Sequence, residues 1–214
     1  MPSSSDPAIL IATRSGDKAR EIRQILESAL GSRLLSLHDA SVEPDPAEDG
    51  VECFPTFLAN AHAKAAFFMQ RTGMPTLADD SGICVHALGG APGVHSRRYA
   101  AKPGLDGLDL DRANNELLLR ELQHTPLPRR TAHYTCAAVL HLADGRRFSA
   151  VGTCSGAILT EPRGNNGFGY DPLFIDPATG ISFAEMDPAA KNRKSHRARA
   201  FRALAATLPK LPGY

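Results

Sequence analysis

The chain has 214 residues, 43% of them hydrophobic, and its 24 lysines and arginines nearly balance its 23 aspartates and glutamates. A chain of this length can bury a core large enough to fold without disulfides or a structural metal. The net charge of +1 excludes the broad basic surface typical of nucleic-acid-binding domains, and no apolar run is long enough to enter a membrane. We expect one globular domain, in one or two lobes, that meets any anionic ligand with a local cluster of cations.

Cysteine usage and the N-terminal sequence indicate a cytoplasmic protein. Cys53, Cys84, Cys136 and Cys154 are widely spaced and form no Cys-x-x-Cys pair, so we expect reduced thiols that pack as small hydrophobic side chains. Residues 1–7 lack the charged and then apolar pattern of a signal peptide. We expect them to form a flexible leader.

The first half of the chain alternates between strand and helix patterns. Residues 8–12 and 33–37 predict strands, and a helix lies between them. Residues 57–69 predict a second helix, on which Asn60 and Lys64 lie one turn apart away from the apolar face. The apolar positions at helical spacing are Ile22, Ile25, Leu26, Ala29 and Leu30 in the first helix, which Gly31 should end, and Ala61, Ala65 and Phe68 in the second.

The second half combines further strands, a hairpin and two helices. Residues 76–88 resemble a strand that is interrupted at residues 79–82. Residues 131–142 and 146–159 predict long strands joined at Asp144-Gly145, a dipeptide that favours a hairpin. The inward positions expected for the two helices are Leu108, Ala113, Leu117, Leu118 and Leu119 within residues 105–122, and Phe201, Leu204, Ala205 and Leu208 near the C-terminus. This interleaving predicts an α/β fold with a mixed sheet.

The loop after the first strand is a candidate phosphate site. Backbone N–H groups at the start of a helix are unpaired and carry partial positive charge, so they can hold an anion. Lys18 falls in the first helical turn, where a cation is unfavourable unless an anion lies nearby. The alternative is a solvated lysine after an ordinary Ser or Asp cap, and the loop does not have the Walker A sequence.

Asp79-Asp80-Ser81-Gly82 forms a second candidate site. In an extended backbone the two adjacent carboxylates point to opposite sides, so one can bind a metal or water while backbone donors hold the other. The alternative is an Asx-type turn. The position beside an apolar strand favours a site, because a carboxylate there is costly to desolvate without a partner.

Phe168-Gly169-Tyr170-Asp171 ends a glycine-rich run and forms a third candidate site. Glycines let the backbone approach a flat ligand closely, and the two aromatic rings are suited to stack on a base. The alternative is a tight loop whose aromatic side chains fill the core.

The basic segment at residues 191–199 forms a fourth candidate site. It predicts a solvated helix face, a nucleic-acid-binding stripe or a ligand contact made by only part of the cluster. If the helix has already begun at Lys191, Lys191 and Ser195 would share a helix face, whereas Arg193 and Arg199 would point elsewhere.

Together these segments resemble the inosine/xanthosine triphosphate pyrophosphatase family, whose members hydrolyse non-standard purine nucleoside triphosphates. The resemblance spans nearly the whole chain. It implies an α/β fold with an elongated mixed sheet flanked by helices, two lobes over residues 1–214 with an active-site cleft between them, and a homodimer. Its most specific parts are residues 77–82 and 87–94, residues 167–172, and Ala184-Glu185-Met186 followed by Lys191 and residues 195–197.

The resemblance also implies residue roles. Asp80 would be the general base and a magnesium ligand, and Glu52 would be a second metal carboxylate. Phe168 would stack on the base, with His196 and Arg197 at its edge. Magnesium would neutralise triphosphate oxygens and orient the attacking water, while lysines stabilise developing charge. The substrate-binding residues implied by the resemblance are Thr13, Arg14, Ser15, Gly16, Asp17, Lys18, Ser81, Phe168, Gly169, Tyr170, Asp171, Lys191, His196 and Arg197.

The chain departs from the family pattern in two places. The family commonly has Thr-Gly-Asn, and a glycine directly before its lysine, where this chain has Thr13-Arg14-Ser15 and Asp17. The helix that usually begins Phe-x-Glu-Asn-Ala has Ala59 in place of the glutamate. These changes leave Asp80 and Lys18 intact but alter the charges around them.

We therefore predict a cytoplasmic, magnesium-dependent enzyme that hydrolyses the triphosphates of inosine and xanthosine to monophosphate and pyrophosphate and so cleanses the nucleotide pool. No nucleic-acid or membrane partner is expected. The alternatives are a pyrophosphatase for a pyrimidine or modified nucleotide, a nucleotide-binding module without catalysis, and a nucleic-acid binder that uses residues 191–202. Asp80 argues against the second alternative, and the net charge of +1 argues against the third.

Overall fold

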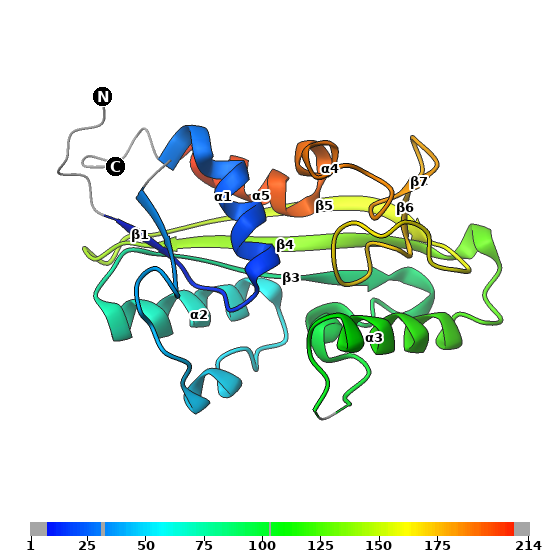
Figure 1. Cartoon of the computed structure of the whole chain (residues 1–214), viewed down its shortest axis with the longest axis horizontal. Helices are drawn as coiled ribbons and strands as arrows, with labels where there is room; N and C mark the ends of the chain where they lie inside the picture. The colour runs from blue at the N-terminus through cyan, green and yellow to red at the C-terminus, as the bar shows by residue number, and fades with distance from the viewer. Residues whose placement is uncertain (1–7, 31–32, 103, 208–214) are drawn as a thin grey trace. The chain divides into compact units, whose positions relative to one another are not determined.

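The computed structural model describes residues 8–30, 33–102 and 104–207 (Figure 1). The expected leader at residues 1–7, and Gly31 and Leu208, lie outside this part of the chain. The chain packs as two compact units, and it passes from one to the other after Asp80, Thr135, Gly152 and Ser195. Of the described residues, unit 1 comprises 8–30, 33–80, 136–152 and 196–207, and unit 2 comprises 81–102, 104–135 and 153–195.

A mixed sheet forms the framework, and its seven strands within the described residues run in the order β2-β1-β3-β4-β5-β6-β7. β1 pairs in parallel with β2 and with β3, whereas β6 pairs antiparallel with β5 and with β7. The predicted α/β fold with a mixed sheet flanked by helices is confirmed, and the active-site cleft between two lobes stays a prediction. The strands are β1 (Ile9–Ile11), β2 (Leu34–Ser36), β3 (Thr76–Val85), β4 (Thr131–His141), β5 (Arg147–Ile158), β6 (Phe174–Asp176) and β7 (Ile181–Ser182).

The predicted helices form, with clear end signals on α2. The Thr56 hydroxyl oxygen accepts a hydrogen bond from the Ala59 N–H, and Gly73 ends the helix in the left-handed conformation. None of the helices in the described residues is both long and apolar enough to span a membrane. The α-helices are α1 (Gly16–Leu30), α2 (Phe57–Thr72), α3 (Gly107–Glu121), α4 (Pro188–Lys194) and α5 (His196–Ala205), and the 3-10 helices are η2 (Pro46–Gly50), η3 (His86–Leu88), η4 (Gly93–Arg98) and η5 (Leu127–Arg129).

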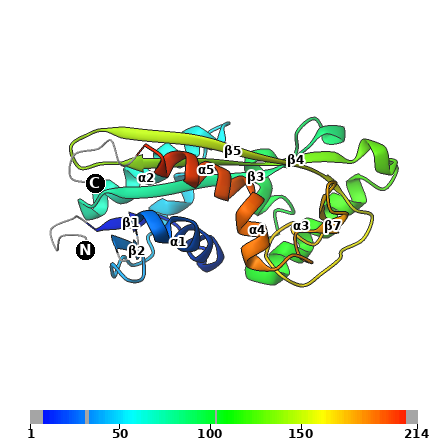
Figure 2. The same ribbon diagram turned by 90° about the horizontal axis from the view of Figure 1, so that it is seen from above.

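Unit 1 covers both faces of its part of the sheet, with α1 and α5 on one face and α2 on the other (Figure 1). Seen from above, α1 lies beside β1 and β2 (Figure 2). Leu77 on β3 packs in the cluster with α1 and α5, and the next residue, Ala78, packs in the cluster with α2. Successive residues of β3 therefore point to opposite faces, as in any extended strand.

Unit 2 has its own core, which contains an aromatic group. The Tyr134 and Phe174 ring centroids lie 4.7 Å apart, and those of Phe174 and Phe183 lie 4.8 Å apart. Leu118 of α3 packs in the same core. Leu108 is 76% exposed, so the expectation that it faces inward is wrong: it lies in the first turn of α3, before the helix reaches the core at Ala113.

One local expectation about the strands is also wrong. The interruption predicted at residues 79–82 does not form, because β3 continues through them as far as Val85 and the Asp79 and Asp80 side chains bind other side chains instead. Ser195 N donates to the Lys191 carbonyl oxygen at 2.9 Å, so Ser195 lies one helical turn after Lys191 at the end of α4, and its extended ψ of 157° separates α4 from α5.

Two imidazole rings meet between α2 and β4, one of them buried (His141) and the other half-buried (His62). His62 Nδ1 on α2 lies 2.8 Å from His141 Nε2 at the end of β4, so one ring donates to the other. His141 is 1% exposed. Burial, His62 and the charge of Arg147 on β5 lower the pKa of His141 to about 4, and burial and Arg147 also lower the pKa of His62.

This pair predicts a loss of stability in mild acid. Because the folded-state pKa of His141 is about 4 and an unfolded histidine has a pKa of about 6.5, the unfolded chain binds more protons between these pH values. Stability should therefore fall as the pH drops through this window. We expect the melting temperature to fall less between pH 7 and pH 5 in His141→Gln than in the wild type. The exposed His124→Gln control should behave as the wild type, and equal falls in all three proteins would contradict the prediction.

A close approach of α5 to β5 predicts a strict requirement for glycine. A Cβ at Gly152 would lie 2.3 Å from the His196 carbonyl oxygen and 2.4 Å from the Ala200 nitrogen, both backbone atoms. We expect Gly152→Ala to lower the free energy of unfolding by about 1–3 kcal/mol, because helix or strand must shift. Gly50→Ala is the matched control, since nothing lies within 4 Å of its Cβ position. Similar urea midpoints for the two variants would contradict this packing.

Candidate functional site

The candidate site in unit 1 begins where β1 leaves the sheet. Ala12 N donates to the Leu77 carbonyl oxygen at 2.8 Å, after which the chain turns into α1, whereas β3 continues to Asp79 and Asp80. Both carboxylates therefore lie beyond the carboxyl end of β1, in a parallel part of the sheet. Ligands of open α/β sheets bind outside the carboxyl ends of their strands.

Asp79 is fully buried on the face that α1 and α5 cover. Its Oδ2 atom accepts hydrogen bonds from Arg197 Nη2 at 3.1 Å and Nε at 3.3 Å, and it lies 3.7 Å from Lys18 Nζ. Burial alone would raise the pKa of this carboxyl, but the charges of Lys18, Arg197 and Lys64 outweigh it and hold the pKa well below its ordinary value. A carboxylate this firmly ionised is a weak proton acceptor.

Asp80 points to the opposite face, toward α2, and its environment is different. Its Oδ2 atom accepts a hydrogen bond of 2.9 Å from Asn60 Nδ2, and Asn60 Oδ1 accepts from the Phe54 N–H at 2.8 Å. Burial and the nearby Glu52 carboxylate raise the pKa of Asp80, although Lys18, Lys64 and the Asn60 hydrogen bond act against them. Of the two adjacent carboxylates, Asp80 is the better candidate for a general base.

Glu52 and Lys64 complete the charged group around Asp80. The Lys64 ammonium pairs directly with a Glu52 carboxylate oxygen. Burial disfavours the charged form of each group, and the attraction between the two acts against burial. The charge of Lys18 also helps to lower the pKa of Glu52. The charges of Asp79 and Asp80 also help to raise the pKa of Lys64. Both groups are therefore ionised at neutral pH.

The donor set here is suited to magnesium. Asp80 and Glu52 supply carboxylate oxygens, and their mutual repulsion, which contributes to the raised pKa of Asp80, favours a divalent cation near both. The described residues contain no group of three or more acidic, histidine or cysteine side chains able to hold a metal ion. Magnesium commonly uses only one or two carboxylates, with substrate phosphates and water supplying the remaining oxygens. The two carboxylates fit such an ion.

The loop before α1 forms a serine cap. Ser15 Oγ accepts a hydrogen bond from the Lys18 N–H at 3.3 Å, and Thr13 Oγ1 accepts from the Ser15 N–H at 3.2 Å. Asp17 pairs with Arg20 at the exposed surface. The loop therefore has the ordinary cap that we considered, and its lysine also reaches a buried carboxylate, so Lys18 is not simply a solvated residue.

Arg14 connects the end of β1 to the segment around η2. Its guanidinium binds both Glu48 carboxylate oxygens, at 2.9 and 2.6 Å, and donates to the carbonyl oxygens of Val42 at 2.7 Å and Glu43 at 2.8 Å. These contacts tie the segment before η2 to the end of β1. A phosphate contact for Arg14 stays a prediction, and its present partners favour a role in holding the loop.

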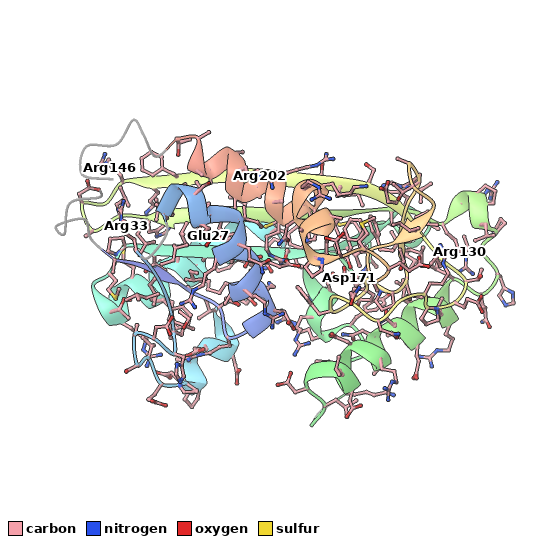
Figure 3. All side chains as sticks on the ribbon, turned by 45° about the horizontal axis from the view of Figure 1, so that its top comes forward. Glu27, Arg33, Arg130, Arg146, Asp171 and Arg202 are labelled. Atoms are coloured by element: carbon pink, nitrogen blue, oxygen red, sulfur yellow. The ribbon has the colours of Figure 1, made fainter. Side chains whose placement is uncertain are left out.

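Unit 2 holds a second cluster, in and around the glycine-rich loop. Lys191 Nζ lies 2.5 Å from Asp171 Oδ2 and 4.7 Å from the centroid of the Phe168 ring. Asp171, which lies among the interior side chains of unit 2 in Figure 3, also accepts a hydrogen bond from the Phe168 N–H at 3.0 Å. A Cβ at Gly167 would lie 2.1 Å from Asp171 Oδ2, so this turn requires glycine.

The two aromatic residues of this loop have different environments. Tyr170 is buried in the unit 2 core and its hydroxyl donates to the Ser96 carbonyl oxygen at 2.8 Å. Phe168 is only half-buried. Core packing therefore accounts for Tyr170, and Phe168 remains the better candidate for stacking on a base.

The predicted site residues fall into both units. Arg197 is 2% exposed and also pairs with Glu21 at 2.6 Å, which excludes the interpretation of it as a solvated cation. Unit 1 contains Thr13, Arg14, Ser15, Gly16, Asp17, Lys18, Glu52, Asp80, His196 and Arg197, and unit 2 contains Ser81, Phe168, Gly169, Tyr170, Asp171 and Lys191. Their functional roles stay predictions.

Sequence reasoning missed three residues of the unit 1 cluster. The spacing of Asn60 and Lys64 was a signal in the sequence, since they lie one turn apart on α2, and Asn60 is buried with the apolar residues of this helix. No sequence feature indicated that Glu21 belongs to the cluster, because a glutamate in an amphipathic helix is ordinarily solvated.

The chain is similar to known proteins over nearly its whole length. The model of the Ham1 family matches residues 9–207. The chain belongs to the Ham1 family. It is 42% identical to a dITP/XTP pyrophosphatase of Leifsonia xyli subsp. xyli, covering 94% of each chain, and 45% identical to one of Geobacter sulfurreducens, covering 90% of this chain and 92% of the relative. A HAM1 protein structure from Coxiella burnetii superposes with a TM-score of 0.80 at 34% identity, over 96% of this chain and all of that one.

The buried position of Arg197 predicts a large stability effect. Removing it would leave the Asp79 and Glu21 carboxylates without their shared cation. We expect Arg197→Met to lower the free energy of unfolding by about 3–5 kcal/mol, as in other broken buried ion pairs. The control is Arg199→Met, because Arg199 is exposed on the same helix. Urea denaturation measures both, and equal losses would show that the Arg197 pairs add no stability.

Proposed function

We propose that this protein hydrolyses the triphosphates of inosine and xanthosine, with dITP among them, to the monophosphate and pyrophosphate. Relatives that match nearly the whole chain are named dITP/XTP pyrophosphatases. The observation that carries the proposal is that two adjacent carboxylates have different environments. Asp79 is held ionised by Lys18 and Arg197, while Asp80 has a raised pKa and is oriented by the Asn60 amide.

The proposed chemistry is attack of water on a phosphorus atom of the triphosphate. Asp80 accepts the proton of the attacking water, and Asn60 keeps one of its oxygens fixed. Lys18 and Lys64 stabilise the negative charge that develops on the phosphate oxygens. We assign magnesium to Asp80 and Glu52, where it would neutralise triphosphate oxygens. Arg197 acts through Asp79, which its guanidinium orients.

We propose that the unit 2 cluster binds the base. The half-buried Phe168 ring offers a stacking face, and Lys191 lies over it. Selection of inosine over adenosine would follow if a buried group is matched by the keto oxygen, because the adenine amino group would leave that group unpaired. We further propose a cytoplasmic homodimer.

Turnover by an Asp80 variant tests this proposal. We expect the wild type to release pyrophosphate, and not orthophosphate, from ITP and XTP faster than from ATP and GTP, and to stop when EDTA removes magnesium. Asp80→Asn keeps the size of the side chain but removes the base and a metal charge. Its kcat should fall about 10²–10⁴-fold, the usual contribution of a general base.

Asp49→Asn is the control, since Asp49 is exposed on η2. Near-normal turnover by Asp80→Asn would overturn the assignment of Asp80 as the general base. Release of orthophosphate would contradict the reaction, and an equal rate on all bases, or a preference for a pyrimidine, would contradict the substrate.

A further inference from the structure

The backbone N–H and carbonyl groups of Gly169, which belong to the two peptide groups on either side of its Cα, are both held by one helix. Gly169 N donates to Asp111 Oδ2 at 2.7 Å, and the Gly169 carbonyl oxygen accepts from Asn115 Nδ2 at 2.9 Å. Asp111 and Asn115 lie four residues apart on α3, so they share a helix face. Neither residue belongs to the glycine-rich loop that they hold.

These two contacts are well shielded and well oriented. The Asp111 side chain is 14% exposed, and Asn115 is buried. The other Asp111 oxygen, Oδ1, accepts a hydrogen bond from Arg97 Nη1 at 3.1 Å, which fixes the plane of the carboxylate. A hydrogen bond from a backbone N–H to an ionised and shielded carboxylate is among the stronger ones in proteins.

The neighbouring peptide carries Phe168. Phe168 N donates to Asp171 Oδ2 at 3.0 Å, so the backbone on the two sides of the Phe168 side chain is held by different partners. Gly169 has a φ of +62° and no atom within 4 Å of its Cβ position. Because no side chain of its own packs at this position, the hydrogen bonds to α3 are what orient the residue.

We propose that Asp111 and Asn115 are positioning residues that clamp the Gly169 peptide and so hold Phe168 in place as the stacking wall for the base. The proposal rests on the proposed function, because the base-binding role of Phe168 belongs to it. The clamp acts on binding: a loop that is competent for only a fraction of the time weakens apparent affinity by that fraction. Its loss should raise KM and leave kcat nearly unchanged, since the groups assigned to hydrolysis are Asp80, Lys18 and Lys64.

The test combines hydrogen exchange without nucleotide and ITP kinetics on the full chain. In Asp111→Ala, exchange within residues 164–172 should become about tenfold faster, and KM for ITP should rise about tenfold, as expected for a lost charge-assisted hydrogen bond. Asn115→Asp, which sets a carboxylate against the Gly169 carbonyl oxygen, should act in the same direction. Asp111→Asn keeps an acceptor and should restore most of the protection and affinity.

Two controls separate the clamp from other effects. Asp109→Ala removes an exposed carboxylate from the same helix, where it pairs with Arg112, and should match the wild type in both measurements. Arg97→Gln removes the neighbouring ion pair but keeps Asp111, and should have a smaller effect than Asp111→Ala.

Three outcomes would overturn the proposal: unchanged exchange in Asp111→Ala, an equal effect of Arg97→Gln, or a fall in kcat with KM unchanged. A wild type that does not hydrolyse ITP would instead refute the proposed function. Hydrogen exchange alone then decides whether the clamp exists, since that measurement uses no substrate.

Discussion

The buried pairing of Arg197 with Asp79 is the interaction on which the rest of unit 1 depends. It joins β3 to α5 and, through Glu21 and Lys18, both to α1. Burying these charges is costly, and only close geometry and several hydrogen bonds offset that cost. The three elements are therefore fixed relative to one another wherever these four side chains meet, and the end of β1, with its loop, is fixed with them.

The same pairing explains why two neighbouring aspartates differ. Strand alternation sends Asp79 to the face of α1 and α5, where the cations lie, and Asp80 to the face of α2, where Asn60 meets it. The Asp79 carboxylate therefore has a structural role and stays ionised. The second keeps a raised pKa, which suits a group that must accept a proton. A shift of strand register by one residue would exchange these two environments.

Much of the fold could be predicted from the sequence, which also indicated Asp80 and Lys18 as candidate site residues but not their neighbour Asn60. The strand before Thr13, the helix with Ala61 and Ala65, and the hairpin at Asp144-Gly145 depend on local periodicity and turn chemistry, and all form. The errors at Leu108 and at residues 79–82 share one cause. Each depends on where a side chain meets another element, and local pattern carries no information about that.

The sequence by itself determined the family, the α/β class and the adjacent placement of Asp79 and Asp80, because these follow from residue order and period. Only the tertiary structure decided that Arg197 is a buried partner of Asp79, that Arg14 binds Glu48, and that α3 holds the Gly169 peptide. The physical reason is that a charged side chain is written identically in the sequence whether it is solvated or buried. Whether burial of the charge is favourable depends on its partner, which can lie more than a hundred residues away in the sequence.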